Sequence, residues 1–193
     1  MTAARSLALH EGQTDPNPRT SCRLIVLRGP SAAGKSTVAR ELARTCPDKV
    51  AILEEDYFRR VILQRKDEDR VACGRMLRAS ALAALASGYH VVLEGILAAG
   101  HYGSTITDLA TRSPRESFLY YFDVSLEETL HRHQSKPIAS EVPPASLRDW
   151  YGAASPLGHP GEIIIPETFT LTQAVRFIQQ TSGVVKASPR VAT

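Results

Sequence analysis

The fold is decided by LIVLRGPSAAGKST, which spans Leu24–Thr37. An apolar run of strand length is followed by two glycines five positions apart, then by a lysine and two hydroxyl residues. The next segment, through Val38 and Leu42, has the apolar spacing of an amphipathic helix. A glycine-containing turn between a buried strand and a helix is typical of a phosphate-binding loop, whereas a chance match would lack this context.

A loop of this kind binds phosphate because its backbone N–H groups and the helix N-terminus converge on phosphate oxygens. Its lysine neutralises the β- and γ-phosphates and its hydroxyl ligates Mg²⁺. The motif therefore predicts ATP and Mg²⁺ as cofactors, with Lys35 as a catalytic cation and Ser36 as a metal ligand. The expected nucleotide-binding residues are Gly29, Ser31, Ala32, Ala33, Gly34, Lys35, Ser36 and Thr37.

The rest of the chain alternates apolar runs of strand length with longer amphipathic segments. This alternation predicts an α/β fold, a three-layer sandwich around a five-stranded parallel sheet. Strands are expected at residues 24–27, 50–53, 90–93, 118–122 and 162–165. Helices are expected at residues 35–45, 68–87, 104–111, 126–133 and 171–180, with capping boxes before the last two.

The length of 193 residues fits a single domain, which we expect to span residues 22–183. Residues 1–21 contain two closely spaced prolines, and residues 184–193 show no clear periodicity, so both are predicted to be flexible tails. The segment Gln134–Pro160 contains five prolines and is predicted to be an irregular excursion of about residues 134–160 that acts as a lid.

The composition favours a cytoplasmic protein. No apolar run has the roughly 20 residues that a membrane span needs, and a secretory signal is not evident. Three widely spaced cysteines indicate reduced thiols. The net charge of +3 arises from scattered residues, which makes nucleic acid an unlikely partner and leaves the oligomeric state open.

With these features the sequence resembles the small P-loop kinases, the group of nucleoside, nucleotide, shikimate, gluconate and antibiotic kinases, from about Arg23 to Gln180. It is similar above all to short bacterial proteins described as uridine-kinase-like. The shared features are the phosphate loop, an Asp after the second strand, and a Leu-Glu-Gly after the third. The resemblance implies strand order 2-3-1-4-5, with ligands at the carboxyl ends of the strands.

The acid after the second strand, Asp56, matches the position where these kinases carry a residue that meets the acceptor hydroxyl. The resemblance makes Asp56 the candidate base and a substrate-binding residue, with Glu54 and Glu55 as rivals and helix capping as the structural alternative. One turn further on, Arg59 and Arg60 are candidates for binding an anionic acceptor, although solvated surface arginines are equally common.

Glu94 ends the third strand and resembles the acid that holds Mg²⁺ through water or contacts the acceptor. A purely structural charge is less expected there, because a charge at the end of a buried strand is costly unless it is paired. Near the predicted lid, Arg132, Lys136 and Arg148 match the cations that stabilise the transferring phosphoryl group, with surface charge as the alternative.

These observations predict an ATP-dependent kinase that transfers the γ-phosphoryl group to a hydroxyl of a small molecule such as a nucleoside, a sugar or an antibiotic. One alternative is a nucleic-acid 5′-hydroxyl kinase, which needs a basic groove that the scattered charge does not suggest. The other is a nucleotide-dependent switch or ATPase, for which an acceptor-binding acid has no use. The acceptor itself depends on the shape of a pocket that the sequence does not reveal.

Overall fold

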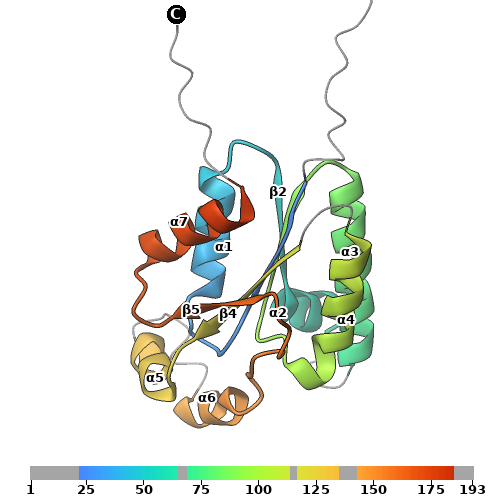
Figure 1. Cartoon of the computed structure of the whole chain (residues 1–193). Coiled ribbons are helices and arrows are strands. Elements are labelled where there is room, and N and C mark those ends of the chain that lie inside the picture. The colour runs from blue at the N-terminus through green and yellow to red at the C-terminus, as the bar shows by residue number, and fades with distance from the viewer. Residues whose placement is uncertain (1–21, 65–68, 114–116, 135–142, 185–193) are drawn as a thin grey trace, which may run out of the picture.

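The structure, a computed structural model, describes residues 22–64, 69–113, 117–134 and 143–184. Its centre is a sheet of five parallel strands in the order β2-β3-β1-β4-β5. Helices cover both faces of this sheet (Figure 1), so the predicted α/β sandwich and its strand order are confirmed. The strands are Leu24–Arg28 (β1), Val50–Glu54 (β2), His90–Glu94 (β3), Ser117–Asp123 (β4) and Glu162–Pro166 (β5).

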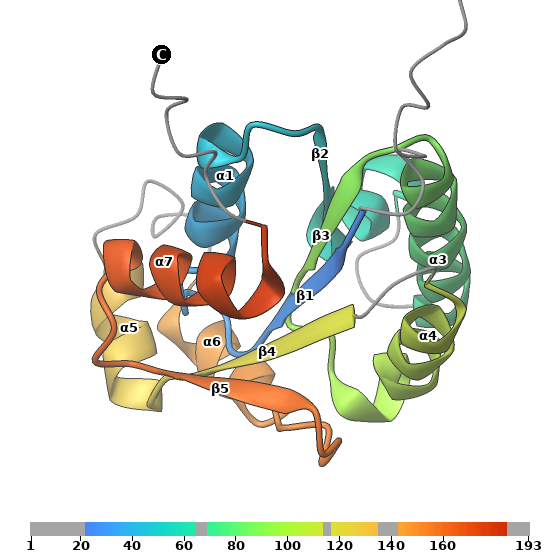
Figure 2. The same ribbon diagram turned by 45° about the horizontal axis from the view of Figure 1, so that its top comes forward.

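The central strand β1 is buried on both faces because its alternate side chains enter two different cores. Leu24 and Val26 face the layer of α3 and α4, whereas Ile25 and Leu27 face the layer of α1 and α7 (Figure 2). These four helices span Lys35–Thr45 (α1), Arg70–Ala86 (α3), Ala99–Arg112 (α4) and Leu171–Ser182 (α7).

Helices α4 and α6 differ most from the sequence prediction. Helix α4 begins at Ala99, five residues before the predicted start, because Gly100 and Gly103 weaken the helical signal of its first turns. Helix α6, Pro144–Tyr151, lies inside the segment that was predicted to be irregular, and that prediction is wrong for these residues. A proline is tolerated in the first turn of a helix, and α6 buries Leu147 against the domain.

The segment after β2 is helical and of mixed type. A short turn, Glu55–Tyr57 (α2), continues into a π-helical stretch, Phe58–Ile62 (η2). Asp56 lies within the first turn, and no side chain caps this helix, so the capping alternative for Asp56 is not observed. Single π-helical turns are frequent at functional sites, which directs attention to this segment.

The carboxyl ends of the strands meet several loops and short helices at one edge of the sheet. The phosphate loop, α2, α6 and α5 (Leu126–Gln134) all lie at this edge (Figure 1). None of the helices in the described ranges is both long and apolar enough to cross a membrane. The predicted flexible tails, 1–21 and 184–193, lie outside the described residues except for Val184.

Candidate active site

The loop before α1 has the backbone conformation that its glycines permit. Gly29 has φ of +135°, and a Cβ atom there would lie 2.7 Å from the carbonyl oxygen of Phe122, so a larger residue is excluded. Gly34 has φ of +99° directly before the helix. The buried Lys35 folds back over the loop, and its Nζ donates hydrogen bonds to the carbonyl oxygens of Gly29 (3.0 Å) and Pro30 (2.6 Å).

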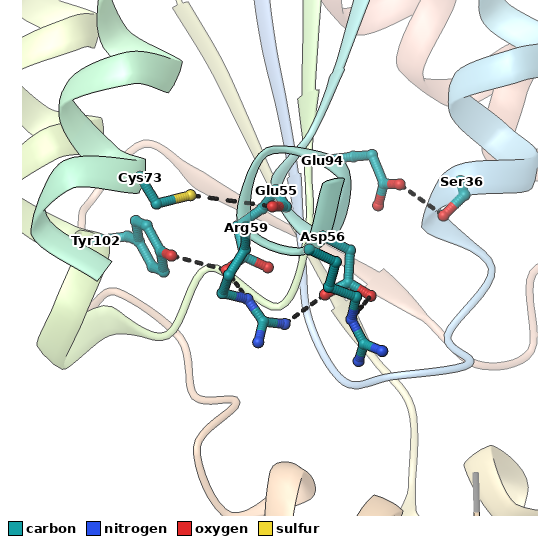
Figure 3. Close-up of polar contacts among 8 residues, drawn as sticks. Ser36, Glu55, Asp56, Arg59, Cys73, Glu94 and Tyr102 are labelled. Atoms are coloured by element: carbon teal, nitrogen blue, oxygen red, sulfur yellow. Dashed lines mark hydrogen bonds and ion pairs between the residues drawn. The ribbon is translucent and has the colours of Figure 1, made fainter. Parts of the chain in front are cut away.

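Ser36 and Glu94 meet beside this loop, as the sequence predicted for a shared metal site. The Oγ atom of Ser36 donates a hydrogen bond of 2.6 Å to Oε1 of Glu94 (Figure 3). Burial raises the pKa of the Glu94 carboxyl, while the nearby Lys35 ammonium acts in the opposite direction. The pair offers hydroxyl and carboxylate oxygens, which are the ligand types that Mg²⁺ prefers.

Three consecutive acids follow β2, and each has a different environment. Glu54 is partly exposed and pairs with Arg40 of α1 at 3.0 Å. Glu55 is buried, and its carboxylate accepts a hydrogen bond of 2.7 Å from the hydroxyl of Tyr102 on α4 (Figure 3). The side chain of Asp56 is 59% exposed, so it is the most accessible acid of the three.

The two arginines of η2 also differ. Arg59 is only 7% exposed and bridges two acids, with Nε 3.0 Å from Glu55 and Nη2 2.5 Å from Asp56 (Figure 3). The side chain of Arg60 is 40% exposed, its Nε lies 3.4 Å from Asp56, and its guanidinium lies 5.9 Å from the ring centre of Trp150. Solvated surface charge, the alternative for both residues, is therefore wrong for Arg59.

Two cavities adjoin the phosphate loop from different sides, and both are lined by Ala32 and Thr37. The first, of about 360 Å³, lies between the loop, α5 and the start of α7, and its walls are largely apolar, with Val38, Phe122 and Phe169. The second, of about 520 Å³, is lined by many more charged residues than the first. It is lined among others by Ser31, Lys35, Ser36, the three acids after β2, Arg59, Arg60, Glu94 and Trp150.

The predicted lid cations are found in separate places. Arg132 lines the first cavity, where its guanidinium donates hydrogen bonds to the carbonyl oxygens of Ala33 (3.3 Å) and Glu167 (2.9 Å). Arg148 is exposed on α6 and lines neither cavity. Lys136 lies outside the described residues. The structure thus brings Arg132, but not Arg148, against the phosphate loop.

The sequence analysis missed Arg28, which is fully buried directly before the loop. Its Nη1 lies 2.6 Å from Glu162 of β5, and its Nε and Nη2 both donate to the carbonyl oxygen of Leu97 (3.2 and 2.8 Å). Leu97 has φ of +45°, so Arg28 holds an unusual turn in the segment that lines the second cavity. The sequence did contain a signal for this role, because Arg28 is a single charged residue in an apolar strand and a buried charge needs a partner.

The chain can now be compared with known proteins. A family model described as an AAA domain matches residues 24–157, from β1 through α6. The chain belongs to this AAA-domain family. The match to this family covers the phosphate loop, the acids after β2, Glu94 and both arginines of η2. No curated protein sequence matches the chain significantly.

Solved structures similar to this AAA domain include small P-loop kinases. A sugar kinase from Janibacter sp. HTCC2649 is 19% identical with a TM-score of 0.68, over 85% of this chain and 98% of that one. A gluconokinase from Sinorhizobium meliloti 1021 is 18% identical with a TM-score of 0.60, over 83% and 93%. The Mycobacterium tuberculosis APS kinase CysC, in complex with AMPPNP and APS, is 17% identical with a TM-score of 0.66, over 82% and 96%. The AAA domain therefore has the fold of the small P-loop kinases.

Proposed function

We propose that this AAA domain is an ATP-dependent phosphotransferase that transfers the γ-phosphoryl group to a hydroxyl of a small molecule. The observation that carries the proposal is the pair of cavities that adjoin one phosphate loop. One cavity suits a nucleoside and the other suits a polar acceptor. A transfer enzyme needs this arrangement, because both substrates must present their reacting atoms at the same place.

In this proposal the nucleotide extends from the first cavity across the phosphate loop. The apolar walls beside Val38 and Phe169 receive the nucleoside, and Arg132 supplies a cation at the edge of the loop. Lys35 neutralises the β- and γ-phosphates with the ammonium that now contacts the loop carbonyls. Ser36 and Glu94 would hold Mg²⁺, which would supply positive charge that offsets the charge of the phosphates.

The acceptor occupies the second cavity, with its hydroxyl at Asp56. This carboxylate is exposed, lines the cavity and is oriented by Arg59. Of its two rivals, Glu54 is paired with Arg40. Glu55 is bound by Tyr102 and Arg59. Phosphoryl transfer has a loose transition state, so the acid mainly orients the hydroxyl and accepts its proton late. Helix α6 already borders this cavity through Trp150, and Arg148 acts as a lid cation in this proposal when its side chain turns toward the phosphate loop during turnover.

The second cavity also favours a small acceptor over the two alternatives. Its volume of about 520 Å³ is in the range of sites for small molecules. An acceptor-binding acid beside the loop distinguishes the site from that of a nucleotide switch. The names of the structural neighbours, a sugar kinase, a gluconokinase and an APS kinase, support the same reaction class for this chain.

The proposal is tested with Lys35→Ala in an assay of ATP turnover over a panel of nucleosides, sugars, hydroxy acids and hydroxylated antibiotics. Loss of the ammonium removes charge stabilisation of the transferring group, so we expect turnover to fall by roughly a hundredfold or more. Lys49→Ala is the matched control, because Lys49 is exposed beside Tyr89 and lines neither cavity. Equal turnover by the two folded variants would exclude the proposal.

Asp56→Asn separates transfer from nucleotide binding in the same assay. The amide keeps the size and one oxygen of the side chain but accepts no proton, so transfer is expected to fall by roughly a hundredfold or more. Nucleotide affinity, measured by calorimetry with AMPPNP, should change little. Normal transfer by this variant would move the base assignment to Glu54, Glu55 or Glu94.

A further inference from the structure

In the acceptor cavity, Arg60 uses few of its hydrogen-bonding groups. In the described part of the chain, the Arg60 guanidinium contacts Asp56 through Nε at 3.4 Å and the ring of Trp150 at 5.9 Å. Its two terminal nitrogens make no hydrogen bond to those residues, and the side chain is 40% exposed at the cavity wall. Arg60 therefore keeps donors for a ligand.

The neighbouring arginine has a different role. Arg59 is buried and divides its guanidinium between Glu55 and Asp56, which lie four and three residues before it on the same helical face. Arg60 follows one position later and faces the cavity. Because Asp56 already accepts a hydrogen bond from Nη2 of Arg59, Arg60 is not needed to satisfy that carboxylate.

The other charged groups of the cavity leave a place for a negatively charged ligand at Arg60. Besides Arg60 the cavity is lined by four cations and four carboxylates, and Glu54 is paired with Arg40 and Glu55 with Arg59. Glu55 is satisfied by Tyr102 and Arg59, so it does not compete for the guanidinium. Arg70, at the start of α3, lines the same cavity. A guanidinium has only donors, and its fork matches the two oxygens of a carboxylate or a phosphate.

We propose that the acceptor carries an anionic group, a carboxylate or a phosphate, and that Arg60 rather than Arg59 binds it. This inference rests on the proposed phosphotransferase function and names the class of its acceptor. Trp150 forms the other side of the anion site, since its ring lies against the Arg60 guanidinium. The bound anion would thus lie between η2 and α6, with the acceptor hydroxyl directed toward Asp56.

The test uses Trp150, the only tryptophan in the chain, as a fluorescent reporter. The full-length protein is first saturated with Mg²⁺ and AMPPNP, so that the phosphate loop is filled. It is then titrated with sulfate as a minimal anion, with gluconate as a hydroxy acid and with glucose 6-phosphate as a phosphate monoester. Sorbitol is the neutral counterpart of gluconate.

We expect a saturable change of emission with at least one of the three anions and none with sorbitol. Arg60→Gln should weaken that response by roughly tenfold or more, because it removes a charge-assisted bidentate contact. Arg60→Lys should restore part of it, since the charge remains but the fork is lost. Arg44→Gln is the matched control, because Arg44 is exposed, pairs with Glu41 and lines neither cavity.

Three results would overturn the inference: no response to any anion, an equal response to sorbitol, or an undiminished response in Arg60→Gln. An anion bound at the phosphate loop instead would give the third result. The titration needs no turnover, so its outcome is independent of the phosphotransferase test. A protein that binds anions through Arg60 but transfers no phosphate contradicts only the proposed function, and one that phosphorylates neutral acceptors equally well contradicts only this inference.

Discussion

Burial of Glu94 costs free energy when its carboxyl is ionised, and this cost is measurable in the protein without ligands. Burial is the largest influence on the group and raises its pKa from the ordinary value of 4.5, while Lys35 and Ser36 lower it less. Because the pKa of Glu94 in the folded state lies above its pKa in the unfolded chain, the folded state binds more protons at pH values between the two. The contribution of Glu94 to stability is therefore lost as the pH rises through its folded-state pKa.

Glu94→Gln should accordingly stabilise the ligand-free protein at pH 7, because the amide has no charge to desolvate and keeps an oxygen for Ser36. Thermal unfolding at pH 7 and at pH 4 measures the effect, and the gain should shrink at pH 4, where the wild-type carboxyl is protonated in the folded state. The control is Glu127→Gln on the exposed surface of α5, which makes the same chemical change without altering a buried site. A lower melting temperature of Glu94→Gln at pH 7 would show that the charged form is net favourable.

At the scale of residues, the sequence predicted what depends on local spacing. Lys35 and Ser36 follow from the loop motif, and the position of Glu94 follows from its strand end beside that loop. The partners of Glu55 did not follow, since Tyr102 lies 47 residues later and approaches only through the packing of α4. The burial of Arg59 also depends on how distant elements pack, so only the structure shows that Arg59 and Arg60 have different environments.

Several elements are joined by the single side chain of Arg28. Its guanidinium connects the end of β1 to Glu162 on β5, to Leu97 between β3 and α4, and to the carbonyl oxygen of Ser155 after α6 at 3.1 Å. The charge is fully buried, and Tyr121 covers it at 5.7 Å. Arg28 thus fixes the segments on which the acceptor cavity is built.

Arg28→Lys keeps the charge but loses the planar guanidinium, whose separate nitrogens bind Leu97 and Glu162 at the same time. Each lost hydrogen bond to a charged group is worth about 1.5–3 kcal/mol, and about 2–4 °C of melting temperature accompanies each kcal/mol in a protein of this size. We therefore expect a melting temperature lower by at least several degrees in differential scanning calorimetry. Arg112→Lys is the control, since Arg112 is exposed and pairs with Asp108 on its own helix. Equal melting temperatures would mean that Arg28 has no structural role.

Helix boundaries were predictable where the caps are local. The box of Thr170 and Gln173 is formed in full at the start of α7. Only half of the predicted box forms at the start of α5, where Ser125 accepts a hydrogen bond from the backbone of Glu128 but donates its own N–H to Glu167. Helix α6 was missed because prolines were interpreted only as helix breakers. Pro144 stands in the first turn, where its missing N–H costs nothing, and the apolar spacing from Leu147 to Tyr151 was the available signal.

At the scale of the whole molecule, the sheet order places the loop between its two cavities. β1 lies at the centre, with β3 and Glu94 on one side and β4 and β5 on the other. The two cavities, which we propose for the nucleoside and the acceptor, are therefore separated by the phosphate loop that borders both. Apolar runs predicted the parallel sheet, but the strand order came from the resemblance to P-loop kinases. Periodicity alone does not specify which buried strands are neighbours.

This arrangement predicts that a nucleotide stabilises the whole fold, because a nucleotide bound as proposed would contact the loop, α5 and the segment before α7 together. A ligand at about 100 times its Kd adds about 2.7 kcal/mol, which corresponds to a rise of roughly 5–10 °C in melting temperature. Mg²⁺ with AMPPNP should produce this shift, whereas adenosine, which lacks the phosphates, should produce little. Lys35→Ala should lose most of the shift through its missing ammonium, and Arg132→Ala should lose part of it because its side chain lines the nucleoside cavity. If Lys35→Ala keeps the full shift, AMPPNP binds elsewhere and the assignment of the phosphate loop is wrong.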